Sequence, residues 1–254
     1  MSIGLFIIGD EILSGKRSDK HLAKVIGLLR VRGMSLDWAQ LLGDDETRIA
    51  EAIRASHARG DVVLSCGGIG ATPDDRTRQA AALAFGVPLL RHAEAERLIV
   101  AEYAERARPN RVLMADFPQG ADLIPNPVNR VSGFFLHQHF FVPGFPEMAW
   151  PMLEWVLDQC LPHLHVADPA VEFSLRAIGS SAEGDLLELM EETLAQYPGI
   201  ALSSLPSRGD AGRPRHIEFG IKGPRALAAQ AFLAFRTRLA QRPELQIKDL
   251  NSPV

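Results

Sequence analysis

The sequence predicts an α/β protein with a three-layer αβα domain built on a mostly parallel sheet, followed by a small α+β domain. Three observations predict this. Over residues 1–160, apolar strand-like runs alternate with amphipathic helical patterns, which favours right-handed crossovers and helices on both faces of the sheet. Residues 161–169 break the alternation, and we expect a linker there. Over residues 170–254 the order changes to βαββαβ, as in a split βαβ domain.

The first domain starts with an apolar strand and continues in strand–helix pairs. A helix follows that Ser18 or Asp19 caps, because its apolar positions recur with the 3.6-residue period. A third strand is uninterrupted in its apolar core, as central parallel strands are. Thr72 and Pro73 are expected as N-cap and first residue of the next helix. The expected strands are 4–9, 36–42, 61–65, one near Leu123, 134–136 and 140–142. The expected helices are one from 18 or 19 that Gly33 stops, one that opens at 44–46 and includes Ile49, Ala52 and Ile53, and 72–85, 93–107 and 147–157.

The second domain is expected to hold four strands and two helices. The strands are 171–178, 200–205, 216–221 and one near 245–247, and the helices are 182–197 and 225–238.

Composition excludes several classes of protein. A hydrophobic fraction of 46% with 23% charged residues supports a folded core rather than disorder. The 27 basic and 31 acidic residues leave a net charge of −4, so we expect no nucleic-acid partner. No apolar run reaches the ~20 residues of a membrane span. Two cysteines make no disulfide framework and suit a reducing compartment, so we expect a cytoplasmic protein.

The segment after the third strand carries the clearest sign of a binding site. Gly67, Gly68 and Gly70 allow a ligand to approach the backbone closely and leave N–H groups free, which suits a phosphate. The helix expected after Thr72 would point its positive end at the same place. Asp74 and Asp75 beside a phosphate require a cation, and Mg²⁺ is held in this way. Helix capping by these two acids is the alternative.

Other strand ends are expected at the same carboxyl edge of the sheet, where open α/β folds bind ligands. Asp10 and Glu11 follow the first strand, although capping of a turn is an alternative role for them. The same loop is not a P-loop, because Arg17 stands where that motif needs Ser or Thr. Asp44-Asp45-Glu46, Pro125-Asn126-Pro127 and Pro143-Gly144-Phe145-Pro146-Glu147 complete the set.

Two groups of residues that can bind metals or act as nucleophiles are given structural roles. His137 and His139 lie between two pairs of phenylalanines, and a hairpin turn is favoured there over a metal site. Cys66 is expected to be a small buried thiol rather than a nucleophile, because no histidine lies near it in the sequence.

Taken in this order, the five loops resemble those of the molybdopterin-binding (molybdenum-cofactor biosynthesis) domain, in the version at the N-terminus of competence/damage-inducible protein A. The resemblance covers about residues 1–160, and the second domain also looks like the small domain that follows there. It implies a phosphorylated pterin or an adenine nucleotide bound over the glycine loop. One branch of the family transfers adenylate to molybdopterin or inserts molybdate, and the other resembles a divalent-metal-dependent pyrophosphatase for ADP-ribose-like dinucleotides. The amidase domain of longer members is absent from this sequence, so deamidase activity is not expected.

The resemblance also assigns residues. Asp75 matches the acid after the glycine loop, Asp45 the acid that opens the preceding helix, and Asp10 and Glu11 the first-loop pair. Asp74 stands where cofactor-synthesis enzymes typically have arginine, which favours the pyrophosphatase branch. There are departures as well: Ala71 replaces a common proline, and Asn129-Arg130 and Ser132 replace the usual Gly-Thr and proline.

These observations give a set of expected roles. We expect Asp75, Asp74 and Asp10 to be catalytic and Asp45, Asp75 and Glu11 to hold a divalent metal, Mg²⁺. A non-catalytic molybdopterin-binding protein, or an adenylyl-transfer enzyme of cofactor biosynthesis, is the alternative. A homo-oligomer, dimer or trimer, is expected from the family, with the aromatic segment 134–141 as a contact. The expected ligand-binding residues are Gly9, Gly15, Gly67, Gly68, Gly70, Thr72, Asn126, Pro127, Gly144, Pro146 and Glu147, with Lys16, Arg76 and Arg78 as candidate phosphate contacts.

Overall fold

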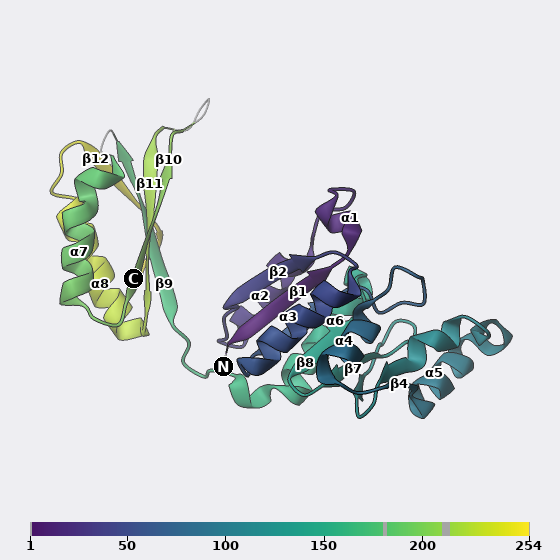
Figure 1. Cartoon of the computed structure of the whole chain (residues 1–254). Helices are drawn as coiled ribbons and strands as arrows, with labels where there is room; N and C mark the ends of the chain where they lie inside the picture. Colours follow the sequence, from purple (N-terminus) through teal and green to yellow (C-terminus); the bar gives the residue numbers. More distant parts are fainter. Residues whose placement is uncertain (1, 180–181, 210–213, 254) are drawn as a thin grey trace. The chain divides into compact units, whose positions relative to one another are not determined.

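The computed structural model describes residues 2–179, 182–209 and 214–253. Contacts divide the chain into two units, Met1–His165 and Val166–Val254 (Figure 1). The segment after the last long helix of the first unit stays attached to that unit, because Leu161 is buried in its core and His165 Nε2 lies 2.9 Å from the Leu157 carbonyl oxygen. Each unit has its own hydrophobic core.

The first unit is built on a six-stranded sheet of order β2-β1-β3-β8-β7-β6. Four neighbouring strands are parallel, and β7 runs antiparallel between β8 and β6. The prediction of a mostly parallel sheet is therefore confirmed. The strands are β1 (Ile3–Ile8), β2 (Trp38–Leu42), β3 (Val62–Cys66), β6 (Asp122–Ile124), β7 (Gly133–Leu136) and β8 (His139–Val142).

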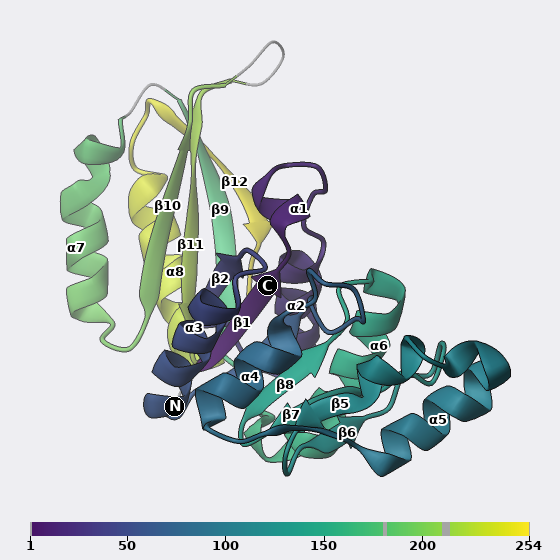
Figure 2. The same cartoon turned by 45° about the vertical axis from the view of Figure 1, so that its right-hand side comes forward.

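Helices cover both faces of this sheet, which makes the three layers (Figure 2). Each face of the sheet has its own hydrophobic core, and alternate residues of β1 point into one or the other. Phe6 belongs to the core with α3, α4 and α5, and Leu5 belongs to the core with α2 and α6. The helices are α1 (Asp10–Leu13), α2 (His21–Val31), α3 (Glu46–Ala58), α4 (Thr77–Phe85), α5 (Ala93–Tyr103) and α6 (Pro146–Trp155), with short helical segments η1 (Ala104–Ala107), η2 (Arg111–Ala115), η3 (Val156–Cys160) and η4 (Pro162–Leu164). An unpredicted antiparallel pair, β4 (Leu89–Arg91) with β5 (Asp116–Pro118), lies beside α4.

The helix starts show where local sequence reasoning succeeds and where it fails. Asp19 accepts hydrogen bonds from the N–H groups of His21 and Leu22, at 2.8 and 3.0 Å, and so caps α2 as predicted. The prediction that Thr72 caps the next helix is wrong, because α4 begins at Thr77. Thr72 instead donates its N–H to Asp75 Oδ2 at 2.9 Å, and the Thr77 N–H bonds to the Gly68 carbonyl at 3.0 Å. These bonds fold the intervening residues into a compact turn.

The phenylalanines of the segment 134–141 pack into the core, whereas its turn residues His137 and Gln138 are exposed. Phe134, Phe140 and Phe141 are all buried, and the rings of Phe134 and Phe141 stack at 4.6 Å between centroids. These three rings are therefore not available as the aromatic subunit contact considered from the sequence. The predicted hairpin turn at His137 is confirmed, since β7 pairs with β8 across it.

The second unit has the predicted βαββαβ order. Its strands form one antiparallel sheet, β10-β11-β9-β12. Phe173, Phe219, Phe232 and Phe235 fill the core between this sheet and its helices. The elements are β9 (Val171–Gly179), η5 (Glu183–Leu186), α7 (Leu187–Gln196), β10 (Ala201–Ser207), β11 (His216–Gly223), α8 (Arg225–Leu239) and β12 (Leu245–Asn251). Among the described residues of the chain, no helix is long and apolar enough to cross a membrane.

Candidate functional site

The sheet topology brings the loops of the first unit to one edge. The loops after β1, β2, β3 and β8 leave the carboxyl ends of parallel strands. Strand β6 runs in the same direction as β8, because β7 is antiparallel to both, so the β6–β7 loop joins them. Along this edge the order is the β2 and β1 loops, then the β3 loop, then the β8 loop and finally the β6–β7 loop.

A cavity of about 420 Å³ opens at this edge. Its volume is within the range of small-molecule sites, roughly 300–1,000 Å³. Every one of these loops contributes to its wall. The lining residues are Ile8, Gly9, Glu11, Arg17, Asp44, Gly67, Gly68, Ile69, Gly70, Ala71, Thr72, Asp74, Asp75, Tyr103, Met114, Asn126, Asn129, Val131, Pro143, Gly144, Phe145 and Met148.

The glycine loop forms the middle of the cavity wall. Gly67 has a φ of 110°, and a Cβ there would lie 2.1 Å from the Ile8 carbonyl oxygen. Gly68 has a φ of 70°, and its Cβ would lie 2.3 Å from Thr77 Oγ1. A side chain at Gly67 would displace the backbone of Ile8, and one at Gly68 would displace the Thr77 side chain, in addition to the strain of a positive φ at both positions. In the described part of the chain, the N–H groups of residues 68–71 have no hydrogen-bond partner, so they are free to bind an anion.

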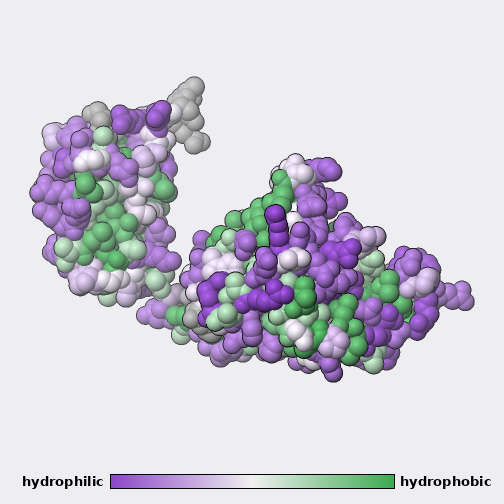
Figure 3. Space-filling view, viewed as in Figure 1, coloured by the Kyte–Doolittle hydropathy of each residue, from purple (hydrophilic) through white to green (hydrophobic). Residues whose placement is uncertain are grey.

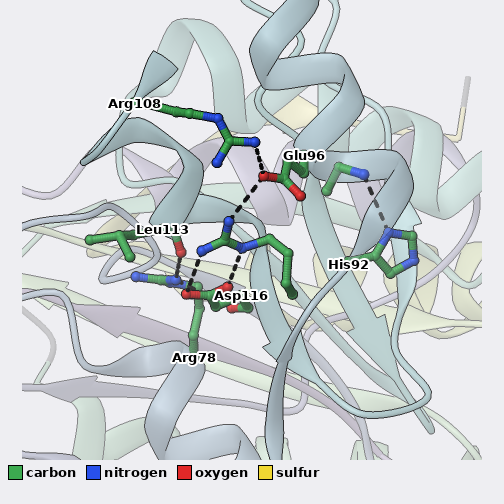
Figure 4. A network of polar contacts seen from close by, with 8 residues as sticks. Arg78, His92, Glu96, Arg108, Leu113 and Asp116 are labelled. Atoms are coloured by element: carbon green, nitrogen blue, oxygen red, sulfur yellow. Dashed lines mark hydrogen bonds and ion pairs between the residues drawn. The ribbon is translucent and has the colours of Figure 1, made fainter. Parts of the chain in front are cut away.

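A buried arginine, Arg78, bonds to this loop through the Gly70 carbonyl. Figure 4 shows Arg78 beside Leu113 and Asp116. The Arg78 guanidinium is 3% exposed and donates to the carbonyl oxygens of Gly70, Leu113 and Asp116. Burial lowers the pKa of Arg78. Asp116 is held in turn by Arg91. Arg78 therefore positions the loop and does not line the cavity, unlike the phosphate contact considered from the sequence.

Carboxylates gather at the β1 and β2 end of the cavity. The Asp10 N–H donates to Asp44 Oδ2 at 2.9 Å, and the Asp44 N–H donates to Asp10 Oδ1 at 3.2 Å. Burial raises the pKa of Asp44, and the nearby charges of Asp10, Glu11 and Asp74 also raise it, whereas the hydrogen bond from the Asp10 N–H opposes the shift. A hydrogen bond from Thr72 lowers the pKa of Asp74. Asp44 is therefore the better proton acceptor of the two at neutral pH.

The opposite end of the cavity is apolar apart from two amides. Tyr103, Met114, Val131, Phe145 and Met148 supply its apolar wall. Asn126 and Asn129, from the β6–β7 loop, hydrogen bond to each other there, with 2.8 Å between Asn126 Nδ2 and Asn129 Oδ1.

The structure brings ten of the predicted residues into the cavity wall and leaves six outside it. Asp45 is outside because its carboxylate accepts the Arg48 N–H at 2.9 Å and caps α3. Asp10 contacts the cavity only through Asp44, and Pro146 and Glu147 form the first turn of α6. Inside the wall are Gly9, Glu11, Gly67, Gly68, Gly70, Thr72, Asp74, Asp75, Asn126 and Gly144; outside are Asp10, Gly15, Asp45, Pro127, Pro146 and Glu147.

Sequence reasoning also missed functional candidates. Asp44 was visible beside Asp45, but a carboxylate that caps a helix cannot be told from its neighbour by sequence. Arg17 lines the cavity, held there by a 3.0 Å bond from its N–H to the Glu11 carbonyl. Its only sequence signal was its place in the first loop. Asn129 was noted only as a departure from the family pattern.

The acidic residues that the structure places at the cavity do not form a complete metal site on their own. Among the described residues, no three His, Cys, Asp or Glu side chains are grouped so that they could hold a metal ion. Mg²⁺, however, is commonly bound by one or two carboxylates together with substrate phosphates. Glu11 and Asp75 line the cavity that also holds the free N–H groups, so they fit a cation that arrives with a phosphate.

Two other reactive groups lie away from the cavity or are inert. Cys66 is buried, and burial raises the pKa of its thiol, as expected of a structural cysteine. His139 is also buried, with its Nε2 2.8 Å from Ser56 Oγ. Burial, together with the charges of His57 and His137, lowers the pKa of His139 to about 3, and Asp61 opposes the shift. The prediction that Cys66 is a buried thiol is confirmed.

Comparisons with known proteins agree with this architecture. The family model described as "Probable molybdopterin binding domain" matches residues 4–163. A CinA-like protein of Syntrophotalea carbinolica is 35% identical over 209 residues, which cover 78% of this chain and 49% of that protein. The chain thus spans about half the length of this relative.

Two further relatives match over more of their own length. A protein of Pyrobaculum calidifontis is 30% identical over 219 residues, which cover 83% of this chain and 82% of the relative. The crystal structure of CinA from Thermoplasma acidophilum, described as a protein with unknown function, has a TM-score of 0.58 and 26% identity. The matched region covers 63% of this chain and 99% of the Thermoplasma chain. With its glycine loop, its edge cavity and these matches, the chain belongs to the molybdopterin-binding domain family and is a relative of the CinA-like proteins.

Proposed function

We propose that the cavity binds a phosphorylated heterocycle, an adenine nucleotide or a phosphorylated pterin, and that the protein is a divalent-metal-dependent pyrophosphatase for ADP-ribose-like dinucleotides. The observation that carries the proposal is one wall in which the free N–H groups of residues 68–71 lie beside Glu11, Asp44, Asp74 and Asp75. Free N–H groups bind phosphate oxygens. The carboxylates repel a phosphate unless a cation lies between them, so the two features together indicate a metal–diphosphate ligand.

The chain's own residues then have distinct roles. The N–H groups of the glycine loop hold one phosphate, and Arg78 keeps the loop in place. Glu11 and Asp75 would hold Mg²⁺, which supplies charge neutralisation for the diphosphate when it is bound. Asp44 takes a proton from the attacking water, whose oxygen forms a bond to phosphorus while the bridging P–O bond breaks. From ADP-ribose this gives AMP and ribose phosphate.

The test is AMP release from ADP-ribose, FAD or ATP by the purified chain with Mg²⁺. Asp75→Asn should lower the rate at least about 100-fold, because the amide keeps the hydrogen bonds from Thr72 but removes the negative charge. Asp37→Asn is the matched control, since Asp37 accepts the Ile3 N–H at 2.7 Å at the other end of β2. If the wild-type protein binds ADP-ribose but releases no AMP, the proposed hydrolase activity is overturned.

A second candidate function involves no hydrolysis: binding alone, in a molybdopterin-binding protein, or adenylyl transfer, in an enzyme of cofactor biosynthesis. It is favoured by the finding that the described carboxylates do not form a ready-made metal site. Tight binding of a pterin phosphate or of ATP with no hydrolysis product would support it.

The chain is also proposed to act as a homo-oligomer, a dimer or a trimer. The support is the free edge of the sheet at β2, where Leu41 is 45% exposed and Leu13 of the neighbouring α1 is 56% exposed. Figure 3 shows hydrophobic residues gathered between α1 and β2. Light scattering on the wild-type chain and on Leu41→Glu tests it: a monomeric wild type overturns the proposal.

A further inference from the structure

Two asparagine side chains in the β6–β7 loop form a fixed pair at one end of the cavity. Asn126 is 5% exposed. Its Oδ1 accepts the Val128 N–H at 3.0 Å, and its Nδ2 donates to the Val131 carbonyl at 3.0 Å and to Asn129 Oδ1 at 2.8 Å. Because a backbone N–H can only donate and a carbonyl can only accept, these contacts fix which end of the amide is oxygen and which is nitrogen.

The same argument fixes Asn129. Its Oδ1 accepts the Val131 N–H at 3.1 Å as well as the bond from Asn126. Turning the amide over would break both bonds and place its N–H groups against two donors. Because Oδ1 already accepts two bonds within the loop, Nδ2 is the atom of this amide that can serve a ligand.

That donor lacks a strong partner in the protein. Within the described part of the chain, the one contact of Asn129 Nδ2 is Met148 Sδ at 3.2 Å. A thioether sulfur is a weak acceptor. A ligand atom that accepts hydrogen bonds well would therefore replace it at little cost.

The surroundings of this donor suit a flat heterocyclic ring. Tyr103, Met114, Val131 and Phe145 line the same cavity, and Phe145 is 51% exposed, with ring surface free for stacking. The sheet order separates this end from the acids, because four strand spacings lie between β1 and β6, roughly 19 Å. The glycine loop lies between the two ends, so a ligand whose phosphates contact that loop extends its ring toward Asn129.

We propose that Asn129 is a specificity-determining residue, which donates a hydrogen bond to an acceptor atom on the ring of the bound heterocycle, and that Asn126 is its positioning residue. The inference rests on the proposed function, namely that a phosphorylated heterocycle occupies the cavity. The site then selects rings that present a ring nitrogen or a carbonyl oxygen at this point and discriminates against rings that present C–H or an amino group there. Such discrimination belongs to this chain's own loop, in which Asn129 departs from the usual family residue.

The experiment is calorimetric titration of ADP, its 1-deaza, 3-deaza and 7-deaza analogues, and pyrophosphate, each with Mg²⁺. Every analogue replaces one ring acceptor by C–H. For the wild-type chain, one analogue should bind about 3- to 10-fold more weakly than ADP, as expected for the loss of one neutral hydrogen bond. Asn129→Leu should bind ADP and all three analogues with equal affinity, while its pyrophosphate affinity stays unchanged.

Three further variants, one of them a control, separate this role from a merely structural effect. Asn129→Asp keeps both accepted hydrogen bonds and replaces the donor by an acceptor, so it should lose the discrimination while keeping the fold and the pyrophosphate affinity. Asn126→Ser should reduce the discrimination because it releases the Asn129 amide. Val128→Ala, an exposed side chain in the same loop that does not line the cavity, should keep the discrimination intact.

The outcomes separate this inference from the proposed function. Three outcomes overturn the role of Asn129 alone. The wild type could bind ADP and its analogues equally, the discrimination could persist in Asn129→Leu and Asn129→Asp, or the wild type could bind pyrophosphate but not ADP. Failure of the wild type to bind either ADP or pyrophosphate overturns the proposed function together with it.

Discussion

Asp10 and Asp44 hold each other by two reciprocal hydrogen bonds, each backbone N–H donating to the other's carboxylate at 2.9 and 3.2 Å. The pair joins the loop after β1 to the loop after β2. It also keeps Asp44 partly buried near the charges of Glu11 and Asp74, which is why its pKa is raised. In this arrangement Asp10 holds the loop of Asp44 in place, and Asp44 is the residue proposed to accept a proton.

The first prediction concerns Asp44 as the proton acceptor. Asp44→Asn should lower the rate of AMP release by about 10²- to 10⁴-fold, the usual contribution of general-base catalysis. In the wild type, activity should be lost as the pH falls through the Asp44 pKa, because the carboxylate must be ionised to accept a proton. Since that pKa is raised in the ligand-free chain, the acidic limb of the kcat/KM profile should lie above the ordinary aspartate value of about 3.9. Asp37→Asn should keep the wild-type profile, and an Asp44→Asn enzyme with unchanged kcat would remove Asp44 from the mechanism.

The second prediction concerns Gly67. Gly67→Ala combines an unfavourable φ of 110° with a Cβ only 2.1 Å from the Ile8 carbonyl oxygen. It should lower the free energy of unfolding by more than the roughly 1–2 kcal/mol of left-handed backbone strain alone. Gly60→Ala is the matched control, because Gly60 has a φ of 70° with open space around its Cβ. Urea unfolding of both variants measures the difference, and equal losses would show that the close approach of the loop to β1 is tolerated.

The third prediction separates support of the glycine loop from binding. Arg78→Met leaves buried carbonyl oxygens without a donor, at roughly 1–3 kcal/mol each. The midpoint temperature of thermal unfolding should fall accordingly. The affinity for pyrophosphate should fall as well, because Gly70 loses its bond to Arg78. Arg97→Met removes only an exposed pair with Glu94 on α5 and should change neither quantity measurably. An Arg78→Met protein of reduced stability but unchanged pyrophosphate affinity contradicts the role of Arg78 in positioning the loop.

The fourth prediction uses His139, whose pKa in the folded state is about 3. Below about pH 6.5 the unfolded chain binds a proton that the folded His139 does not. The free energy of unfolding should therefore decrease as the pH falls from 6.5 toward 3, by up to about 1.4 kcal/mol per pH unit from this residue. His139→Phe should reduce this slope, as measured by urea unfolding at pH 7, 6 and 5. His163→Gln, at an exposed histidine, is the control and should keep the wild-type slope. An unchanged slope in His139→Phe would show that another residue causes the pH dependence of stability.

Most strands and helices could be predicted from the sequence because their signals are local. The apolar run of β3 and the 3.6-residue period of α2 depend only on neighbouring residues. The start of α4 could not be predicted, since it is decided by the bond between Thr77 and the Gly68 carbonyl, across nine positions of the chain. The short pair β4–β5 depends on two segments about 27 residues apart, paired as Leu90 with Phe117.

The candidate site was predicted in its loops but not in its finer roles. Glycines and acids at strand ends place the cavity correctly, because parallel strands meet at one edge. Which acid faces the cavity depends on competing local bonds, as with Asp45, which caps α3 while Asp44 lines the wall. The orientation of Asn129 depends on a network with Asn126 and Val131 that only the folded loop creates.

The asparagine pair also bears on how such a protein can be re-engineered. The acids and the glycine loop come from residues 9–75, whereas the two amides come from a single surface connection between Ile124 and Gly133. Asn126 and Asn129 bond mainly to each other and to the backbone of Val128 and Val131 in that same connection, so its structure depends little on the rest of the site. On the roles proposed above, exchanging this connection among relatives should transfer the preference for a ring and leave the acids and the glycine loop unchanged.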